Sequence, residues 1–364
     1  MKIAINAIRV SRKGGGGLDH YIIHLVNQLA KMGVDFDLFT VAPHHFTQVN
    51  PRRIRNLFII FGDLIRLIWT QIFFPFYLFF GKYDLVFSPS QIDALPFSPV
   101  KQVITVLDLI PFILTEQKHK HLFFLKTLFP MALKKGTQII TISENTKRDL
   151  LRLFTVPEDL VTVIPLSPLN DCKRPEKSFQ NNIPYIFCLS NNDPHKNLAR
   201  LIEAFSLIKD RSHCHLMIAG YQNPAHQEKL DRLVLEKKIG NRVRFLGHVS
   251  DEELQTLYRE CEIFVYPSLY EGFGLPPLEA LSYGVPTIVS RSSSLPEVVG
   301  EAGLYFDPQS VQDMGEKMLQ LLMDEKLKAK LRDLGVKQAQ LFSWEKTASE
   351  TIRVFHRMIR LNEK

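Results

Sequence analysis

A chain of 364 residues is too long for one ordinary hydrophobic core and long enough for two domains of about 100–200 residues each. Hydrophobic residues make up 45% and charged residues 23%, a globular composition that excludes wholesale disorder. The net charge is +7, and all of the excess lies in the first half: residues 1–168 hold 19 basic and 12 acidic residues, whereas 169–364 hold 26 of each. A basic half indicates an anionic partner such as a membrane surface, although an ordinary solvated surface explains the count equally well.

The cysteines and the start of the chain indicate the cellular compartment and whether a metal site is expected. Four cysteines are scattered, without CxxC pairs or neighbouring histidines at metal spacing, and no HExxH motif occurs. We therefore expect no metal site and a reducing compartment, which favours a cytoplasmic location. Residues Met1 to Ala7 run directly into a strand pattern, so no signal peptide is expected.

Short β-branched runs alternate with longer periodic segments along the first half, which is typical of parallel α/β construction. A helix is predicted at Leu18–Lys31, because its apolar residues share one face after a glycine-rich turn. The predicted strands are Lys2–Asn6, Asp35–Val41, Leu85–Ser88, Gln102–Val106, Gln138–Ile142 and Val161–Ile164.

Two apolar segments of the first half have more than one interpretation. Leu57–Phe80 is interrupted by charges and a proline, so it falls short of the roughly 20 clean apolar residues of a spanning helix. The helical spacing of its apolar residues predicts a core helix in preference to a helix lying on a bilayer. These residues are Leu57, Ile60, Phe61, Leu64, Ile65 and Ile68. His119–Phe129 mixes basic and aromatic residues, and both docking on anionic lipid and core packing are open.

The stretch Ser167–Asn182 is polar and contains prolines, which is typical of a linker between domains. A second alternating series follows it. Its predicted strands are Tyr185–Leu189, His215–Ala219, Val243–Leu246, Ile263–Tyr266, Thr287–Ser290 and Leu304–Phe306, and its helices are Leu198–Lys209, Ala225–Lys238, Asp251–Cys261 and Leu278–Tyr283. We predict two Rossmann-like, doubly wound parallel-sheet domains, 1–167 and 168–344, facing a cleft, with a terminal helix at 345–364 packing back on the first.

The strongest chemical signal is the segment YPSLYEGFGLPPLE, residues Tyr266 to Glu279. A strand leads into a loop with Gly272 and Gly274, and Pro276 and Pro277 stand ahead of a short apolar helix. Such a loop presents backbone N–H groups and a helix start to an anion such as a diphosphate. Glu279, in the first turn, suits the diol of a ribose, and Glu271 suits hexose hydroxyls. Each glutamate alone would be taken as solvated surface, and the combination favours a ligand site.

The segment YEGFGLPPLEALSYGVPTIVS resembles the donor-binding signature of retaining glycosyltransferases of family 4, and the SSLPEV that follows resembles the bacterial polysaccharide mannosyltransferases among them. Further similar stretches are DLIPF, ITISENTKRDL, FLGHVSDEELQTLY and FSWEKTA, so the resemblance covers essentially the whole chain. It implies the GT-B fold and metal-independent chemistry. It also implies that Glu279 holds the ribose, that Glu271 contacts the sugar, and that the backbone of Gly272, Phe273, Gly274 and Leu275 binds sugar and phosphate.

Two glycine-rich or polar loops complete the predicted donor site. In SNNDPHKN, after a predicted strand, Lys196 is expected to reach a diphosphate as a point charge at a helix start. The family pattern has an arginine about six residues earlier, where Ser190 and Asn191 stand here. Either hydrogen bonding from these two residues substitutes for the missing cation, or the positive charge comes from elsewhere. The turn containing Gly15 and Gly16 reaches donor phosphates and acceptor by the same resemblance, with a merely flexible turn as the alternative.

The segment Val106-Leu107-Asp108 departs from the family pattern. Family members commonly have a histidine before this aspartate, and Leu107 can neither donate nor accept a proton. Asp108 is therefore expected to do electrostatic and orienting work together with Glu271 and Lys196, or to cap the next turn as a purely structural residue.

The resemblance thus implies a retaining, metal-independent hexosyltransferase that needs no cofactor beyond a nucleotide-sugar co-substrate, with GDP-mannose as the best candidate. The expected acceptor is a saccharide or lipid-linked saccharide in surface polysaccharide synthesis. We expect no nucleic-acid partner, and peripheral association of the basic half with the inner face of the membrane is a further expectation. The alternatives are a catalytically impaired scaffold, a transferase using a UDP-sugar, and a nicotinamide-dependent oxidoreductase suggested only by the glycine turn.

Overall fold

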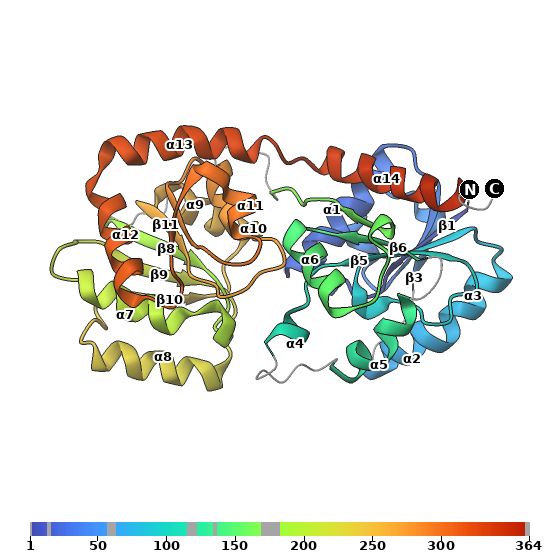
Figure 1. Cartoon of the computed structure of the whole chain (residues 1–364), viewed down its shortest axis with the longest axis horizontal. Helices are drawn as coiled ribbons and strands as arrows, with labels where there is room; N and C mark the ends of the chain where they lie inside the picture. The colour runs from blue at the N-terminus through green and yellow to red at the C-terminus, as the bar shows by residue number, and fades with distance from the viewer. Residues whose placement is uncertain are drawn as a thin grey trace. The chain divides into compact units, whose positions relative to one another are not determined.

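The computed structural model describes residues 2–12, 16–56, 63–114, 122–133, 137–168 and 183–360. Its internal contacts divide the chain into two compact units (Figure 1). The first unit is Met1–Ser167 together with Ser343–Lys364, and the second is Pro168–Phe342. Within the described segments, no helix is both long enough and apolar enough to cross a bilayer.

The first unit contains a seven-stranded parallel sheet in the order β3-β2-β1-β4-β5-β6-β7. The strands are β1 (Ile3–Ala7), β2 (Phe36–Thr40), β3 (Ile54–Asn56), β4 (Leu85–Ser88), β5 (Lys101–Val106), β6 (Thr137–Thr141) and β7 (Val161–Val163). The helices are α1 (Gly17–Lys31), α2 (Asp63–Ile68), the π-helical turn η3 (Trp69–Phe73), α3 (Phe74–Phe80), α4 (Ile110–Ile113), α5 (Leu122–Ala132), α6 (Glu144–Leu153) and α14 (Trp344–Arg360). The strand order reverses between β1 and β4, which makes this the switch point of the sheet.

The second unit repeats this plan with a six-stranded parallel sheet in the order β10-β9-β8-β11-β12-β13. The strands are β8 (Tyr185–Leu189), β9 (His215–Ala219), β10 (Val243–Gly247), β11 (Ile263–Tyr266), β12 (Thr287–Ser290) and β13 (Gly303–Phe306). The helices are α7 (Leu198–Ile208), α8 (Pro224–Glu236), α9 (Asp251–Glu260), α10 (Leu275–Ser282), α11 (Leu295–Val299), α12 (Val311–Met323) and α13 (Glu325–Ala339). Here the order reverses between β8 and β11.

Burial explains why these runs form strands. All five residues of β1 and of β2 are buried, as expected of central parallel strands covered on both faces. In the second unit, side chains of β8, β9, β11 and β12 form one continuous core with those of α7 and α12. The predicted fold class, two doubly wound parallel α/β sheets in tandem, is confirmed; the predicted cleft concerns the relative placement of the units and stays a prediction.

The apolar segment that begins at Leu57 is only half buried where the structure describes it. Phe74 and Leu78 are fully buried, which agrees with a core helix. Ile65 and Ile68 are 46% and 41% exposed, so the expectation that they face the core is wrong. Helical spacing identified an apolar stripe correctly, but this segment is apolar on two faces and only one of them packs on the sheet. Leu57, Ile60 and Phe61 lie outside the described residues.

The described part of the segment His119–Phe129 packs in the core. Phe124, Leu125 and Phe129 of α5 are at most 3% exposed and join the cluster beneath β5 and β6. Of the two interpretations open for this segment, Phe124 and Phe129 follow core packing, because a buried ring is not available to lipid.

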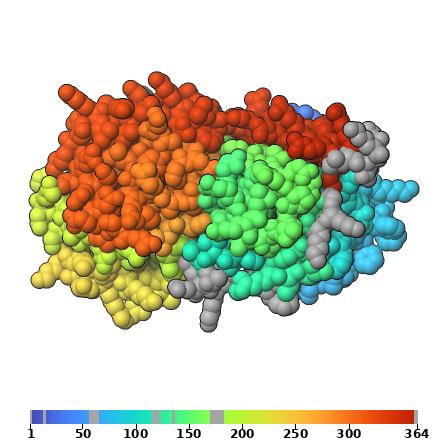
Figure 2. Space-filling view, in the orientation of Figure 1, coloured from blue at the N-terminus to red at the C-terminus, as the bar shows by residue number. Residues whose placement is uncertain are grey.

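The terminal helix α14 packs within the first unit (Figures 1 and 2). Phe355, fully buried, meets Phe87 of β4 edge-on with 5.2 Å between ring centroids. The Thr347 hydroxyl donates to the carbonyl of Pro165, and the Lys101 ammonium donates to the carbonyl of Ile359. The last helix of the chain is therefore part of the core of the first unit.

Candidate functional site

The switch point of the second sheet brings together the two loops that the sequence singled out. Strands β8 and β11 are adjacent and parallel, and they end at Leu189 and Tyr266. The loops that leave them contain Lys196 and Glu271, respectively. In open parallel sheets, ligands bind outside the carboxyl ends of strands at this position.

Lys196, Tyr266 and Glu271 form a compact buried cluster. The Lys196 Nζ lies 2.6 Å from Glu271 Oε1, and the Tyr266 hydroxyl donates to the same oxygen at 2.8 Å. The Lys196 Nζ also lies 3.3 Å from the Tyr266 hydroxyl oxygen. The Lys196 and Glu271 side chains are only 15% and 11% exposed, so their charges are largely shielded from water and are matched to each other.

The electrostatics of Glu271 follow from this contact. Burial by itself would raise the pKa of the carboxyl, but the adjacent Lys196 ammonium outweighs that effect and the net pKa lies below its usual value. Glu271 is therefore a carboxylate throughout the neutral range. Lys196 was expected to face a diphosphate, and in the structure it is ion-paired with Glu271. A ligand that binds either charge must therefore compete with this ion pair.

The loop after β11 reaches a helix start that depends on glycine. Gly274 precedes α10 with a φ of +115°, and a Cβ there would lie 2.7 Å from Leu295 Cδ2. Pro276 and Pro277 occupy the first turn of α10, where their missing N–H groups cost no hydrogen bond. The residues whose backbone N–H groups were predicted to bind an anion, Gly272, Phe273, Gly274 and Leu275, thus form a loop that leads into a helix N-terminus.

Glu279 lies inside α10 and is only 3% exposed. The Tyr258 hydroxyl donates to its Oε2 at 3.0 Å. Burial raises the pKa of the Glu279 carboxyl to about 8, against the opposing effect of this hydrogen bond. The group is therefore mostly protonated at neutral pH, in contrast to Glu271, and neither glutamate points into bulk water.

The loop after β8 is held by its own hydrogen bonds. The Asn191 amide donates to Asp193 Oδ2 at 2.9 Å, and the Ser190 hydroxyl donates to the carbonyl of Asn191. Asn197, in a left-handed conformation with a φ of +62°, donates through its side chain to the carbonyl of Pro267 at 3.0 Å. Asn197 thereby ties the Lys196 loop to the Glu271 loop.

The remaining predicted residues belong to the first unit. The Asp108 carboxylate accepts from the N–H of Ile110 at 3.0 Å, in the turn that leads into α4, whose N-cap residue is Leu109. The N–H of Leu107 donates to the side chain of Gln91 at 3.1 Å. Gly16 precedes α1, and a Cβ there would meet no heavy atom within 4 Å. Gly15 lies outside the described residues.

Several supporting residues were not singled out from the sequence. The Ser293 hydroxyl accepts from the N–H of Glu271 at 2.9 Å, and Ser293 itself has a φ of +47°. The Ser294 hydroxyl donates to the carbonyls of Glu271 and Phe273 at 3.1 and 2.7 Å. A Cβ on Gly220, which has a φ of +124°, would lie 2.5 Å from the carbonyl oxygen of Ser190. The serine run after β12 is visible in the sequence, but its hydrogen bonds to a loop 20 residues earlier are long-range.

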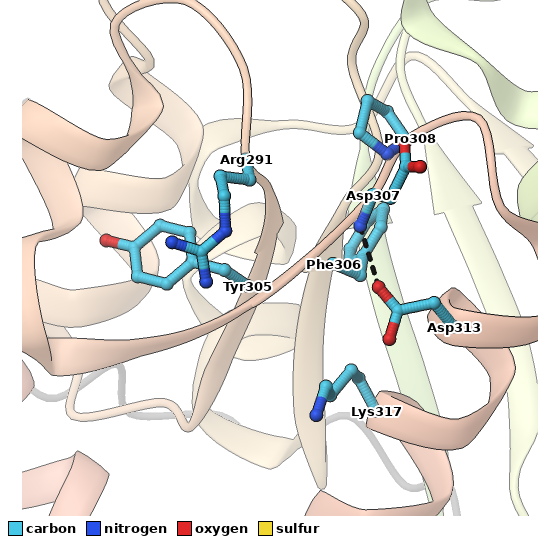
Figure 3. A pocket seen from close by; sticks show the side chains of 7 residues that line it. All are labelled: Arg291, Tyr305, Phe306, Asp307, Pro308, Asp313 and Lys317. Atoms are coloured by element: carbon cyan, nitrogen blue, oxygen red, sulfur yellow. Dashed lines mark hydrogen bonds between the residues drawn. The ribbon is translucent and has the colours of Figure 1, made fainter.

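A pocket of about 390 Å³ lies at the carboxyl ends of β12 and β13 (Figure 3). Arg291 stacks over Tyr305, with its guanidinium carbon 5.0 Å from the ring centroid. The two cations of the lining, Arg291 and Lys317, are balanced by Asp307 and Asp313, so the pocket carries no excess charge for an anion. Within the described residues, no group of three or more His, Cys, Asp or Glu side chains could hold a metal ion.

Comparison with known proteins agrees with this architecture. The family "Glycosyltransferase Family 4" matches residues 15–166, and the family "Glycosyl transferases group 1" matches residues 171–338. Sucrose-phosphate synthase from Thermosynechococcus elongatus superposes with a TM-score of 0.78 at 20% identity, covering 99% of this chain and 100% of that one. Alr3699/HepE from Anabaena, solved with UDP-glucose, superposes with a TM-score of 0.78 at 16% identity over 98% and 100% of the two chains. At these identities, the structures establish the fold alone.

Sequence relatives include bacterial mannosyltransferases. O-antigen chain mannosyltransferase B of Escherichia coli is 35% identical over 238 residues, which cover 62% of this chain and 61% of that protein. The serotype-specific mannosyltransferase WbdA of Escherichia coli is 30% identical over 288 residues, covering 73% and 34%. The chain thus spans less than two thirds of the length of these relatives.

The two tandem sheets and the loop pair at the second switch point define a protein of the GT-B fold class. The two family matches, one on each unit, are more specific. The chain belongs to the glycosyltransferases that combine a family 4 N-terminal region with a group 1 C-terminal region.

The pairing of Lys196 with Glu271 leads to a prediction about stability. Lys196→Met leaves a buried carboxylate without its cation, and we expect this to lower the free energy of unfolding by about 3–5 kcal/mol. Adding Glu271→Gln to that variant removes the unpaired charge and should restore most of the loss. Urea denaturation followed by circular dichroism measures both effects; a double variant no more stable than Lys196→Met would contradict the pairing.

The raised pKa of Glu279 predicts a pH dependence with a definite sign. The folded state holds a proton on this carboxyl up to about pH 8, whereas the unfolded state releases it near the ordinary value of 4.5. The protonated Glu279 carboxyl therefore makes its full contribution to the free energy of unfolding below pH 4.5, and this contribution is lost as the pH rises towards 8. We expect Glu279→Gln, which cannot titrate, to gain stability relative to the native chain between pH 5 and pH 8, on the order of a few kcal/mol. Thermal unfolding midpoints at several pH values test this, and parallel curves for the two proteins would refute it.

Proposed function

We propose that the chain transfers a hexose from a nucleotide sugar to a saccharide or lipid-linked saccharide acceptor in surface polysaccharide synthesis. The observation that carries the proposal is the convergence of Lys196, Glu271 and the start of α10 at the second switch point. Mannose from GDP-mannose is the best candidate donor, because O-antigen chain mannosyltransferase B and the serotype-specific mannosyltransferase WbdA, both similar to this chain, carry the names of mannosyltransferases.

Each part of the site has a task in donor binding. The backbone N–H groups of Gly272 to Leu275 and the N-terminus of α10 suit the diphosphate, which they meet with a positive partial charge. Glu279, kept neutral by burial, can both accept and donate a hydrogen bond, which suits a ribose diol and avoids repulsion from the diphosphate. Ser190 and Asn191 supply neutral hydrogen-bonding groups beside the diphosphate.

When the donor binds, each residue of the Lys196–Glu271 ion pair contacts a different group of the donor. The Lys196 ammonium exchanges Glu271 for a phosphate oxygen, and the Glu271 carboxylate exchanges Lys196 for hydroxyls of the hexose. A ligand that supplies both groups satisfies both buried charges. A ligand that supplies only one leaves the other charge buried and unmatched.

We propose a retaining reaction without a metal ion or a general base from the chain at position 107. The bond from the anomeric carbon to the leaving phosphate oxygen breaks. The acceptor hydroxyl oxygen forms a new bond to the anomeric carbon from the same face, and its proton passes to the leaving phosphate oxygen. Leu107 cannot take part in proton transfer. Lys196 stabilises the charge on the leaving diphosphate, Glu271 orients the hexose, and Asp108 contributes by holding the turn that precedes α4.

Two alternatives have specific support. A UDP-sugar donor is favoured by the likeness to Alr3699/HepE, which was solved with UDP-glucose. A catalytically silent scaffold is favoured by Leu107 and by Ser190 and Asn191 in place of a cationic residue. The oxidoreductase alternative rests only on the glycine turn and has no support from the family matches.

A lipid-linked acceptor would bring the chain to the inner face of the membrane, in agreement with a cytoplasmic location and with the excess of basic residues in its first half. We propose no metal and no cofactor beyond the nucleotide sugar, and no nucleic-acid partner.

The proposal predicts a defined loss of donor affinity. Glu279→Ala removes the group assigned to the ribose, and we expect binding of GDP-mannose to weaken by roughly tenfold to hundredfold. Thermal shifts with GDP, GDP-mannose, UDP and UDP-glucose measure affinity and base preference together, because a ligand of the native state raises its stability. Glu301→Ala, an exposed glutamate of the same unit, is the matched control and should bind as the native chain does.

Product formation then separates the enzyme from the scaffold. Release of nucleoside diphosphate only when a saccharide acceptor is supplied, with the sugar retained in its α configuration, is the expected result. Equal affinity of Glu279→Ala and native chain for every nucleotide would refute the site, whereas tight binding without turnover on any acceptor would favour the scaffold.

A further inference from the structure

The helical segment α2–η3–α3 exposes an unusually apolar outer surface. A surface helix is normally polar on the side turned away from the core. Here Phe74 and Leu78 fill the core side at 0% exposure, yet the outer side is apolar as well. Its eight large side chains, between 41% and 76% exposed, form what we call the aromatic face: Ile65, Ile68, Ile72, Phe73, Phe76, Tyr77, Phe79 and Phe80.

Spacing and location show that this is one continuous surface. The positions recur at three- and four-residue intervals, so they lie along one side of the segment. The segment lies at the edge of the first unit (light blue, at the right in Figures 1 and 2). An apolar surface of this extent marks an interaction site, whereas scattered exposed apolar residues would need no explanation. The groups assigned to the donor lie in the second unit, apart from the turn with Gly15 and Gly16, and none of them belongs to the aromatic face, so donor binding does not account for this surface.

Cations border the aromatic face on the side of the sheet edge. A pocket of about 750 Å³ is lined by Phe76, Tyr77 and Phe80 together with Lys2 and Arg55. Lys82 follows α3 directly, is exposed, and makes no ion pair in the described part of the chain.

The borders are positive even after local pairing. Arg55 lies 3.6 Å from Asp37, which also pairs with Arg53, and the Arg53 guanidinium reaches Asp35 as well. Two carboxylates thus serve two arginines. The Asp84 carboxylate accepts from the backbone N–H of Lys2, so the four cations Lys2, Arg53, Arg55 and Lys82 face three carboxylates and the border keeps one net positive charge. Phenylalanine and isoleucine beside lysine and arginine are the groups that bind the interface of a bilayer containing anionic lipids.

The charge distribution decides between a bilayer and a second copy of the chain. A twofold dimer through the aromatic face would bring the same surface of each copy together, and with it two positively charged borders. A bilayer with anionic headgroups instead complements these cations while it covers the rings. The described segment Asp63–Phe80 is too short and too interrupted to cross a bilayer, so the fitting geometry is a helix lying in its surface.

We propose that the aromatic face of α2–η3–α3 docks the chain on an anionic bilayer, with the rings among the upper acyl chains and Lys82, Arg55 and Lys2 at the headgroup phosphates. The proposal deepens the proposed membrane location by assigning the surface responsible. Its test uses neither donor nor acceptor, so its failure and that of the transferase function are distinguishable.

Vesicle flotation of the whole chain tests the proposal. We expect binding to vesicles of phosphatidylcholine with phosphatidylglycerol, and much weaker binding to phosphatidylcholine alone. Phe79→Ser with Phe80→Ser removes two rings that are 64% and 76% exposed, and should weaken binding about tenfold to hundredfold. Lys82→Asn, which suits the left-handed backbone there (φ +53°), should weaken binding to the anionic vesicles about fivefold and leave neutral vesicles unaffected.

Matched controls keep the test decisive. Leu235→Ser changes a side chain that is 74% exposed on α8 of the second unit, and should float as the native chain does. The double variant must keep the native circular dichroism and a cooperative thermal unfolding transition, which shows that it is folded. The proposal is overturned if the folded double variant binds anionic vesicles as strongly as the native chain does. It is also overturned if the native chain does not bind anionic vesicles. A native dimer that the double variant abolishes overturns it as well, since the aromatic face would then serve a second copy.

A spectroscopic measurement gives an independent readout. The chain has two tryptophans, and Trp69 lies against Phe74 and Tyr77 with ring centroids 5.2 and 6.1 Å away. In a Trp344→Phe variant, Trp69 is the sole tryptophan. We expect vesicles with brominated acyl chains to quench its fluorescence. Sedimentation with such vesicles without quenching would show that the chain binds lipid through another surface, which also overturns the proposal.

Discussion

The contact between Lys196 and Glu271 is possible only because the sheet of the second unit reverses direction between β8 and β11. Successive loops leave these neighbouring strands on opposite faces of the sheet, so residues 75 positions apart meet at 2.6 Å. The first unit has a comparable pair at its own switch point, where Arg9 after β1 lies 3.0 Å from Asp93 after β4. In both units, buried opposite charges join the two halves of the sheet.

The second pair differs in what surrounds it. Tyr266 shares its carboxylate, Asn197 ties its two loops together, and serines after β12 hold the backbone of Glu271 in place. The positions of Lys196 and Glu271 are therefore fixed before any ligand arrives, which lowers the entropy lost on binding. Glu279 and Glu271 lie eight positions apart along the chain. Both are buried, but only Glu271 has an adjacent ammonium, so Glu271 is ionised whereas burial keeps Glu279 neutral.

Most of the strands could be predicted because parallel strands are apolar runs bounded by polar turns. Five predicted strands, among them Tyr185–Leu189 and Ile263–Tyr266, agree with the structure at both ends. The short edge strand β3 was missed, since three residues carry no periodicity. Helix α10 begins at Leu275 rather than at Leu278, because prolines are tolerated in a first turn and were taken as part of the loop.

The site was predictable where chemistry is local and not where it depends on folding. Glycines and glutamates within one segment identified the loop after β11, but the bond from Tyr258 to Glu279 and the ion pair of Lys196 join distant parts of the chain. Ile65 and Ile68 show the same limit: spacing predicts that a helix has an apolar stripe, but it does not tell which of two apolar faces the sheet will cover.

The central claim is that the loop at 271–275 and the start of α10 bind a diphosphate through their backbone N–H groups. Hydrogen–deuterium exchange of the native chain with and without GDP tests it directly, since bound amides exchange more slowly. The account predicts new protection in residues 271–279 of the second unit. Protection confined to the glycine turn of the first unit, with residues 271–279 unchanged, would contradict it.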